Sequence, residues 1–268
     1  MPDISILLPT RGRTEMLGRS IQSLIQHADH PESIEWLLAF DDDDANSLRY
    51  FLDHIAHYID DSGGKYTCLG FQPMGYTRLN QYLNALAPRA RAPWWIFWND
   101  DAIMMDDHWD TVILSQGDRF CIQAFDTHNK HPYSIFPIVP RAWWEVLGHL
   151  SEHPLNDAYI SQIAWMLDIM VRIDIRVEHE RYDLTGKNLD DTFRQRNLRS
   201  LEGDTSRATD FNHDDHRQCR RKQAVKISQY LEKQGQDITH FREVMAGRRD
   251  PWAKMMAADV NGQMTRLG

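Results

Sequence analysis

The sequence predicts an α/β fold in which helices flank a mostly parallel central sheet. Short apolar runs alternate with amphipathic stripes through the first part of the chain. A run of apolar, mostly aromatic residues at 94–98 ends directly in Asn99, Asp100 and Asp101. After about Tyr182 the composition becomes polar, and two further helical stripes follow. Because alternating strands and helices imply parallel pairing with right-handed crossovers, we expect a Rossmann-like sheet with a helical C-terminal extension.

The first third of the chain is predicted to have the order β-α-β-α-β. The three strands are short apolar runs, 4–8, 35–40 and 66–69, bounded by turn residues. The two helices between them each carry their apolar side chains on one face. These stripes are Leu17, Ile21, Leu24 and Ile25 in the first helix, and Leu48, Phe51, Leu52, Ile55 and Ile59 in the second.

The middle of the chain continues this alternation. The unbroken apolar run at 94–98 is typical of a strand that is buried on both faces. A helix is predicted before it, with Leu79, Leu83 and Leu86 facing inward. Further strands are predicted over 120–124, 134–139 and 173–177, and further helices over 141–147 and from Asn156 onward.

A chain of 268 residues is long enough for one large domain with an appendage. We expect the domain to cover residues 1–182. The polar stretch 183–221 is predicted to be a long loop or lid, and residues 222–268 are predicted to form the helical extension.

The composition excludes several classes of protein. A net charge of −9 argues against a general nucleic-acid binder, which needs a basic face. The three cysteines are widely spaced and form neither a zinc pattern nor a disulfide framework, which favours a reducing compartment. The sequence begins without a basic, apolar leader and contains no run long enough to span a membrane. We therefore expect a cytoplasmic protein without a membrane span.

The acidic residues after the aromatic strand are the first candidate site. In open α/β sheets, ligands bind outside the carboxyl ends of the strands. Paired carboxylates there suit Mg²⁺ or Mn²⁺, which favour oxygen ligands. The alternative is a solvated turn after a core strand, because Asp and Asn are common in turns.

Taken together, several segments resemble the glycosyltransferases of the GT-A fold, in particular the family 2-like enzymes. The resemblance extends from Ile4 to about His179. It rests on an opening strand and loop, an acidic loop after the second strand, a Gly-containing helix start, an Asp-X-Asp position, an acceptor-side segment and a late acidic helix start. These are residues 6–13, 40–47, 75–80, 99–101, 136–148 and 156–157. The sequence departs from the pattern where Arg11 and Gly12 replace Tyr-Asn, and where Asn99 replaces the first carboxylate.

The resemblance implies a metal-dependent transferase that moves a sugar from a nucleotide-sugar to an acceptor hydroxyl, with inversion. Asp157 would be the catalytic base, and Asp101 and His179 would bind a divalent cation, Mn²⁺ or Mg²⁺. The implied donor-binding residues are Pro9, Thr10, Arg11, Arg13, Asp41, Asp43, Arg78, Asn99 and Asp100. We expect a UDP-sugar rather than a GDP-sugar as donor, and an acceptor that is a glycan, a lipid or a protein.

Each assignment has a structural alternative. Asp157 could only cap its helix, His179 could be a surface residue between two glutamates, and Asp41 to Asp44 could be a solvated helix start. Two other functions stay open. A nucleotidyltransferase uses similar acidic sites but usually has a Gly-rich loop after the first strand, where Gly12 stands alone. Asn99 is compatible with a non-catalytic nucleotide- or glycan-binding module on the same fold.

Overall fold

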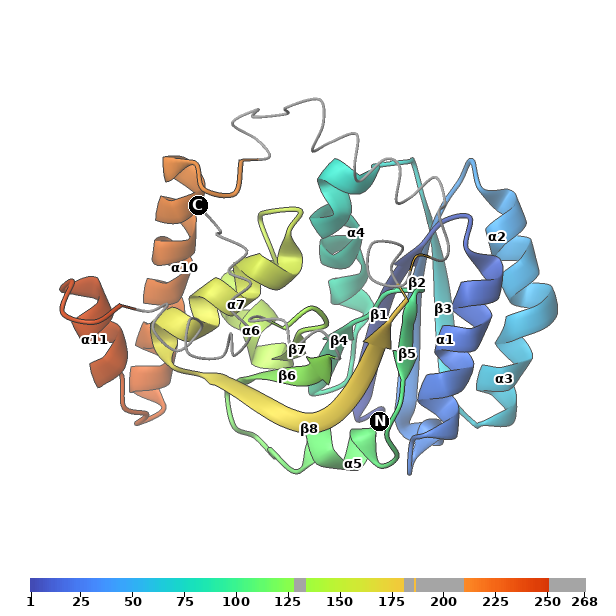
Figure 1. The fold of residues 1–268 in the computed structure, drawn as a ribbon, viewed down its shortest axis with the longest axis horizontal. Coiled ribbons are helices and arrows are strands. Elements are labelled where there is room, and N and C mark those ends of the chain that lie inside the picture. The colour runs from blue at the N-terminus through green and yellow to red at the C-terminus, as the bar shows by residue number, and fades with distance from the viewer. Residues whose placement is uncertain (128–133, 181–185, 187–209, 251–268) are drawn as a thin grey trace.

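The computed structural model describes residues 1–127, 134–180, 186 and 210–250 (Figure 1). Most of the predicted lid, 183–221, lies outside these residues, as does the end of the predicted extension beyond 250. Where the described part resumes, helix α10 begins at Asp214, inside the stretch predicted as a polar loop. The helical extension therefore starts earlier than the sequence pattern indicates.

The strands and helices alternate as predicted through the first part of the chain. The strands are β1 (Ile4–Thr10), β2 (Ile34–Asp41), β3 (Lys65–Phe71), β4 (Trp94–Phe97), β5 (Ala102–Met104), β6 (Ile122–Thr127), β7 (Ile138–Pro140) and β8 (Met170–His179). The α-helices are α1 (Thr14–Gln26), α2 (Ala45–Tyr50), α3 (Ala56–Asp61), α4 (Leu79–Leu86), α5 (Trp109–Leu114), α6 (Arg141–Leu147), α7 (Asn156–Leu167), α10 (Asp214–Lys233) and α11 (Thr239–Met245). The strand predicted over 134–139 is limited to β7, and its earlier residues are irregular.

The strands form one mixed sheet of eight strands, in the order β3-β2-β1-β4-β7-β6-β8-β5. The half containing β1 to β4 is parallel, as the β-α-β order predicts. In the other half β7 runs antiparallel to β4 and β6, and β5 runs antiparallel to β8. The pairing of Ala102 in β5 with His179 in β8 brings the end of β8 to the residue after Asp101.

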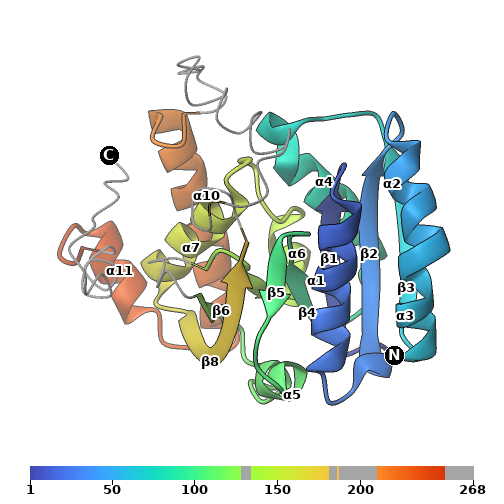
Figure 2. The same ribbon diagram turned by 45° about the vertical axis from the view of Figure 1, so that its right-hand side comes forward.

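Each face of the sheet is covered by its own layer of helices (Figures 1 and 2). On β4, Trp94 and Ile96 belong to the apolar core under α1 and α3, whereas Trp95 and Phe97 belong to the core under α4, α6 and α7. All four residues are buried, so the prediction of a strand buried on both faces is confirmed. The end of this strand is consequently held from both sides.

Helix α7 is enclosed more completely than a surface helix normally is. Each of its residues except Asp157 is buried. Helices α10 and α11 pack against it on the side away from the sheet, with Ala224, Ile227 and Phe241 in the same core cluster as Ile160 and Ile163. A helix that is apolar on all sides needs such cover.

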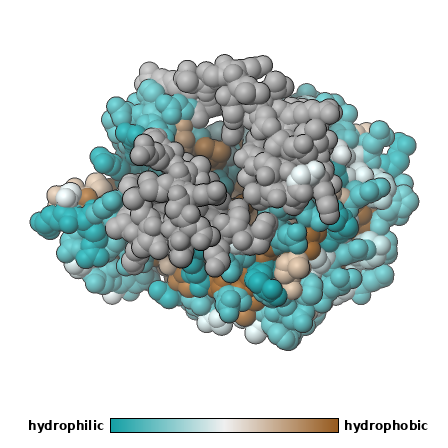
Figure 3. Space-filling model, in the orientation of Figure 1, coloured by the Kyte–Doolittle hydropathy of each residue, from teal (hydrophilic) through white to brown (hydrophobic). Residues whose placement is uncertain are grey.

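Hydrophilic side chains dominate the described surface in the view of Figure 3. Among the described residues, the large hydrophobic side chains that are exposed are Met1, Leu52, Met105 and Met245. No described helix is both long and apolar enough to cross a membrane.

Candidate active site

A cavity of about 240 Å³ lies at the carboxyl ends of β1, β2 and β4. It is the position where open α/β sheets bind ligands. Most of the residues that the sequence nominated line this cavity together: Pro9, Thr10, Arg11, Arg13, Asp41, Asn99, Asp100, Asp101, Asp157 and His179. The chain therefore brings segments that are distant in sequence to a single pocket.

The Asp100–Asp101 pair is buried, and three side chains hold it through four contacts. The Asp100 carboxylate accepts from the Thr10 hydroxyl at 2.8 Å and from Arg13 Nη1 at 3.0 Å. The Asp101 carboxylate accepts from the same Arg13 nitrogen at 3.1 Å, and its other oxygen lies 3.1 Å from His179 Nε2. Each of the four carboxylate oxygens thus has a neighbour within hydrogen-bond distance.

The backbone around this pair is fixed by uncharged contacts. The Trp98 indole N–H donates to the Ser20 hydroxyl at 2.8 Å, and that hydroxyl donates to the Asn99 carbonyl at 3.2 Å. The Glu180 N–H donates to the Asp101 carbonyl at 2.8 Å, which joins the end of β8 to the same turn. Helix α1 and strand β8 thereby orient the two carboxylates.

The two carboxyl groups differ in their electrostatic surroundings. Burial raises the pKa of Asp100, the Arg13 guanidinium opposes this rise, and the neighbouring Asp101 carboxylate adds to it. Burial acts in the same direction on Asp101, but the His179 imidazole and the Arg13 guanidinium outweigh it, so the pKa of Asp101 lies below its ordinary value. Asp101 is therefore the more strongly anionic of the two.

Asp101 and His179 have the chemistry and spacing of a two-ligand cation site. Two atoms bound at right angles to one Mg²⁺, each about 2.1 Å from it, lie about 3 Å apart, which matches the separation of Asp101 Oδ1 and His179 Nε2. No group of three or more His, Cys, Asp or Glu side chains among the described residues is arranged to hold a metal. Two protein ligands still fit the group, because Mg²⁺ keeps several waters and substrate phosphates as its remaining ligands.

Arg11 reaches a second pair of carboxylates at the rim of the cavity. Its guanidinium donates to Asp41 at 2.8 Å and forms a two-bond contact with Asp43. The hydrogen bonds and charge of Asp43 and Asp41 raise the pKa of Arg11 further above its ordinary value. Gly12, with φ +65°, turns the chain between Arg11 and Arg13, so that one loop supplies an arginine to each of two carboxylate pairs. Its N–H donates to Asp44 at 2.8 Å.

Tyr82 is a cavity residue that the sequence pattern did not identify. Its hydroxyl donates to Asp41 and accepts from the Met74 N–H at 2.8 Å. Burial, followed by the hydrogen bond to Asp41, raises the pKa of Tyr82 to about 12. In the sequence it lies three residues after Leu79, within the inward stripe of α4, and such a stripe indicates core packing. Tyr76, Trp98 and Leu155 also line the cavity without having been predicted.

On the opposite side of the cavity, Asp157 lies in the first turn of α7. The residue at the N-cap position is Leu155, so Asp157 does not occupy the cap position. One of its carboxylate oxygens accepts from the Ala158 N–H at 2.8 Å. The neighbouring Asn156 amide donates to the Pro154 carbonyl at 3.2 Å. Asp157 is partly exposed and lines the cavity, as a group that acts on a ligand must.

Two nominated residues lie away from the cavity wall. Arg78 ends a short 3-10 turn, Tyr76–Arg78, and its side chain is exposed without lining the cavity. Asp43 is also outside the wall, but it is connected to the cavity through Arg11. All the predicted site residues except Arg78 therefore line the cavity or contact a residue that lines it.

No family model matches the chain, and no curated protein matches it in sequence. Among solved structures, the mannosyltransferase PcManGT from Pyrobaculum calidifontis, in complex with GDP-Man and Mn²⁺, aligns with a TM-score of 0.51 at 10% identity. That alignment covers 97% of this chain and 88% of PcManGT.

TarS of S. aureus aligns with a TM-score of 0.49 at 11% identity, over 85% of this chain and 43% of TarS, so the chain spans less than half of that protein. A shorter TarS structure, residues 1–349 with UDP-GlcNAc, has a TM-score of 0.49 and 11% identity over 96% of this chain and 79% of that one. The alignment with PcManGT, together with the topology, shows the fold: the chain has the same GT-A fold as that mannosyltransferase.

Proposed function

We propose that this protein is a nucleotide-sugar-dependent glycosyltransferase. The observation that carries the proposal is a single cavity at the carboxyl edge of a GT-A sheet, which contains a buried, charge-balanced carboxylate pair and, on its other side, Asp157. A fold neighbour that binds GDP-Man and Mn²⁺ supports the same substrate class.

The donor-binding part is assigned to the β1–α1 loop and the carboxylates that it contacts. Arg11, Asp41 and Asp43 are proposed to bind the base and ribose, because carboxylates accept from base N–H groups and sugar hydroxyls. Arg13 is proposed to bind the diphosphate, for which a planar guanidinium is well suited. Pro9, Thr10, Asn99 and Asp100 form the adjoining wall. The exposed Arg78 has no assigned contact in this scheme.

Asp101 and His179 are the residues that would hold a divalent cation. When bound, such a cation neutralises the charge that develops on the diphosphate as it leaves the sugar. His179 is buried, and its Nδ1 has no hydrogen-bond partner among the described residues. A neutral imidazole is the form in which histidine binds metals.

Asp157 is proposed as the general base. An acceptor hydroxyl oxygen forms a bond to the anomeric carbon while the bond from that carbon to the diphosphate oxygen breaks. The hydroxyl proton passes to the Asp157 carboxylate, and the diphosphate leaves with the bonding electrons. Because attack and departure occur on opposite sides of the carbon, the product has the inverted anomeric configuration.

The decisive experiment measures sugar transfer and donor hydrolysis with a panel of UDP- and GDP-sugars, with Mn²⁺ and with a chelator. The sequence favours UDP, whereas the neighbour structure holds GDP-Man, so both bases are included. We expect turnover only with the cation. We expect Asp157→Asn to lower kcat by roughly 10²–10⁴-fold with little change in donor affinity, because the base acts in the transition state.

The matched control is Asp53→Asn, which removes a carboxylate from an exposed helical position and should leave kcat unchanged. An Asp157→Asn protein that turns over within a few-fold of the parent at all pH values would refute the base assignment. A product that retains the donor configuration would refute inversion. Nucleotide binding without turnover of any donor would favour the non-catalytic module suggested by Asn99.

A further inference from the structure

The Arg13 side chain lies where it competes with a cation for the Asp100–Asp101 pair. A single nitrogen, Nη1, donates to Asp100 at 3.0 Å and to Asp101 at 3.1 Å. The Arg13 side chain is 11% exposed, and both carboxylates are buried. A divalent cation bound by Asp101 and His179 would therefore have the Arg13 guanidinium close to it, in a site with little water to screen the two positive charges.

Arg11 supplies an internal comparison, because it lies in the same loop and carries the same charge. Its guanidinium contacts a different carboxylate pair, Asp41 and Asp43, and is 41% exposed. The two arginines are therefore not interchangeable. Arg11 carries positive charge at the rim, whereas Arg13 carries it against the proposed cation ligand.

We propose that Arg13 is a resident counter-ion that keeps the cation site closed until a nucleoside diphosphate binds. The inference rests on the proposed function, since it takes Asp101 and His179 as the cation ligands. The phosphate oxygens offer the guanidinium an alternative anionic partner within the same cavity, which Arg13 lines. A guanidinium that donates to phosphate would leave the Asp101 carboxylate available to hold a cation together with His179.

The consequence is a positive coupling between cation and nucleotide. Nucleotide tightens cation binding by some factor, and by thermodynamic necessity the cation tightens nucleotide binding by the same factor. Arg13 is the positioning residue for this coupling. It donates to the carboxylate pair in the closed site and to phosphate in the loaded one.

The test measures Mn²⁺ binding to the full chain by electron paramagnetic resonance of free Mn²⁺, without nucleotide and with saturating UDP or GDP. We expect the parent to bind Mn²⁺ weakly alone and more tightly with one of the nucleotides, after correction for Mn²⁺–nucleotide complexes in solution. We expect Arg13→Gln to bind Mn²⁺ alone at least about tenfold more tightly than the parent, and to lose most of the coupling.

The matched control is Arg141→Gln, which removes the same charge from an exposed pair with Glu145 on α6 and should not alter Mn²⁺ affinity. Arg13→Lys keeps the positive charge, so its affinity for Mn²⁺ alone should stay near that of the parent even if the Gln variant does not fold. Thermal melting by circular dichroism establishes the folded state of each variant.

An Arg13→Gln protein with unchanged or weaker Mn²⁺ affinity overturns the proposal, as does an Arg13→Lys protein that binds Mn²⁺ equally well with and without nucleotide. Absence of Mn²⁺ binding in every variant, with nucleotide present, refutes both this inference and the cation site beneath it. Tighter Mn²⁺ binding by Arg13→Gln in a protein that transfers no sugar from any donor supports this inference while the proposed function fails.

Discussion

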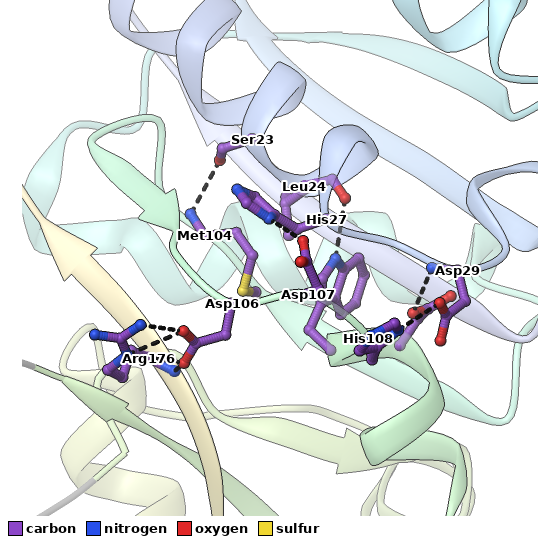
Figure 4. Close-up of polar contacts among 11 residues, drawn as sticks. Ser23, Leu24, His27, Asp29, Met104, Asp106, Asp107, His108 and Arg176 are labelled. Atoms are coloured by element: carbon purple, nitrogen blue, oxygen red, sulfur yellow. Dashed lines mark hydrogen bonds and ion pairs between the residues drawn. The ribbon is translucent and has the colours of Figure 1, made fainter.

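Two clusters of acidic and basic side chains lie at opposite ends of α1 and differ in how much water reaches them. The buried cluster consists of Arg13, Asp100, Asp101 and His179. The exposed cluster, shown in Figure 4, consists of His27, Asp29, Asp106, Asp107, His108 and Arg176. Strands β5 and β8 connect the two clusters, since each runs from one to the other.

The ion pairs of the exposed cluster are as short as those of the buried one. His27 lies 2.6 Å from Asp107, His108 lies 2.6 Å from Asp29, and Arg176 donates to Asp106. Yet the Asp107 and His108 side chains are each 69% exposed, so water and salt screen their charges. The same residue types can bind a charged ligand strongly at one end of α1 and contribute little at the other.

At the exposed end, buried neutral contacts hold the chain instead. The Met104 N–H donates to the Ser23 hydroxyl at 3.0 Å, and the Trp109 indole donates to the Leu24 carbonyl at 2.9 Å (Figure 4 shows both bonds). Both bonds are buried, where an unmade hydrogen bond is costly. Distance alone therefore does not rank polar contacts, whereas distance together with burial does.

The largest expected effect comes from Asp101→Asn, which removes one carboxylate charge from the buried cluster and keeps the size of the side chain. We expect Mn²⁺-dependent nucleotide affinity to fall at least about 100-fold, because a cation ligand is lost outright. Isothermal titration calorimetry with UDP and GDP measures it. Asp107→Asn, in the exposed cluster, should bind like the parent, and equal losses in the two variants would contradict the comparison.

The second prediction separates burial from function. Glu35 is buried near the start of β2, at the end away from the cavity. It accepts from the Ser5 hydroxyl at 2.6 Å and from the Ala92 N–H at 3.2 Å. Glu35→Ala should lower the free energy of unfolding by about 3 kcal/mol, because the buried Ser5 hydroxyl and the Arg91 N–H and guanidinium all lose their acceptor, while the Ala92 N–H keeps only the Ser5 hydroxyl oxygen. Urea unfolding measures this loss.

In the same Glu35→Ala protein, nucleotide affinity in Mn²⁺ should be unchanged under conditions where it is folded. The exposed Glu32→Ala variant is the stability control. If the Glu35→Ala protein is as stable as the Glu32→Ala protein, removing a buried, hydrogen-bonded carboxylate costs no more stability than removing an exposed one.

The smallest expected effect is a pH dependence at the exposed cluster. The hydrogen bond that His108 donates to the Asp29 carboxylate raises the pKa of His108 above its ordinary value of 6.5. A raised folded-state pKa contributes stability that is fully present below the unfolded pKa and is lost as pH rises through the folded pKa. His108→Asn tolerates the positive φ of this residue, which is +65°. Because the substitution removes this ion pair, it should lower the melting temperature more at about pH 5.5 than at about pH 8.5. If the melting temperature falls equally at the two pH values, the ion pair of His108 with Asp29 does not cause the loss of stability.

The fold and the grouping of most predicted site residues around one cavity were predictable, because both depend on local patterns. The strand at 94–97 and the acids after it are contiguous, and parallel strands place their carboxyl ends together. Arg13 was nominated, but its position between two carboxylates depends on contacts across almost ninety residues, which no local pattern encodes. The antiparallel pairing of β4 with β7 was likewise not predictable, because an apolar run does not specify its neighbour or its direction.

Other features were missed for identifiable physical reasons. Tyr82 has the spacing of a core residue and is indeed buried, and only the position of Asp41 shows that its hydroxyl belongs to the site. Arg78 matched a motif by its place in the sequence, but the 3-10 turn leaves its side chain exposed. The first turn of α10 is polar, with Asp214 and Asp215, and acidic residues at a helix start resemble loop composition.

The enclosure of α7 also has a consequence for the order in which the molecule is made. A ribosome that has reached the end of β8 has already produced the buried cluster and Asp157, but not α10. Until α10 and α11 emerge, the apolar outer side of α7, with Ile160 and Ile163, has no cover from them. Such a nascent chain exposes apolar surface and is a target for chaperones. The apolar cover of the helix that carries the proposed base is therefore supplied by the last described segments to be synthesised.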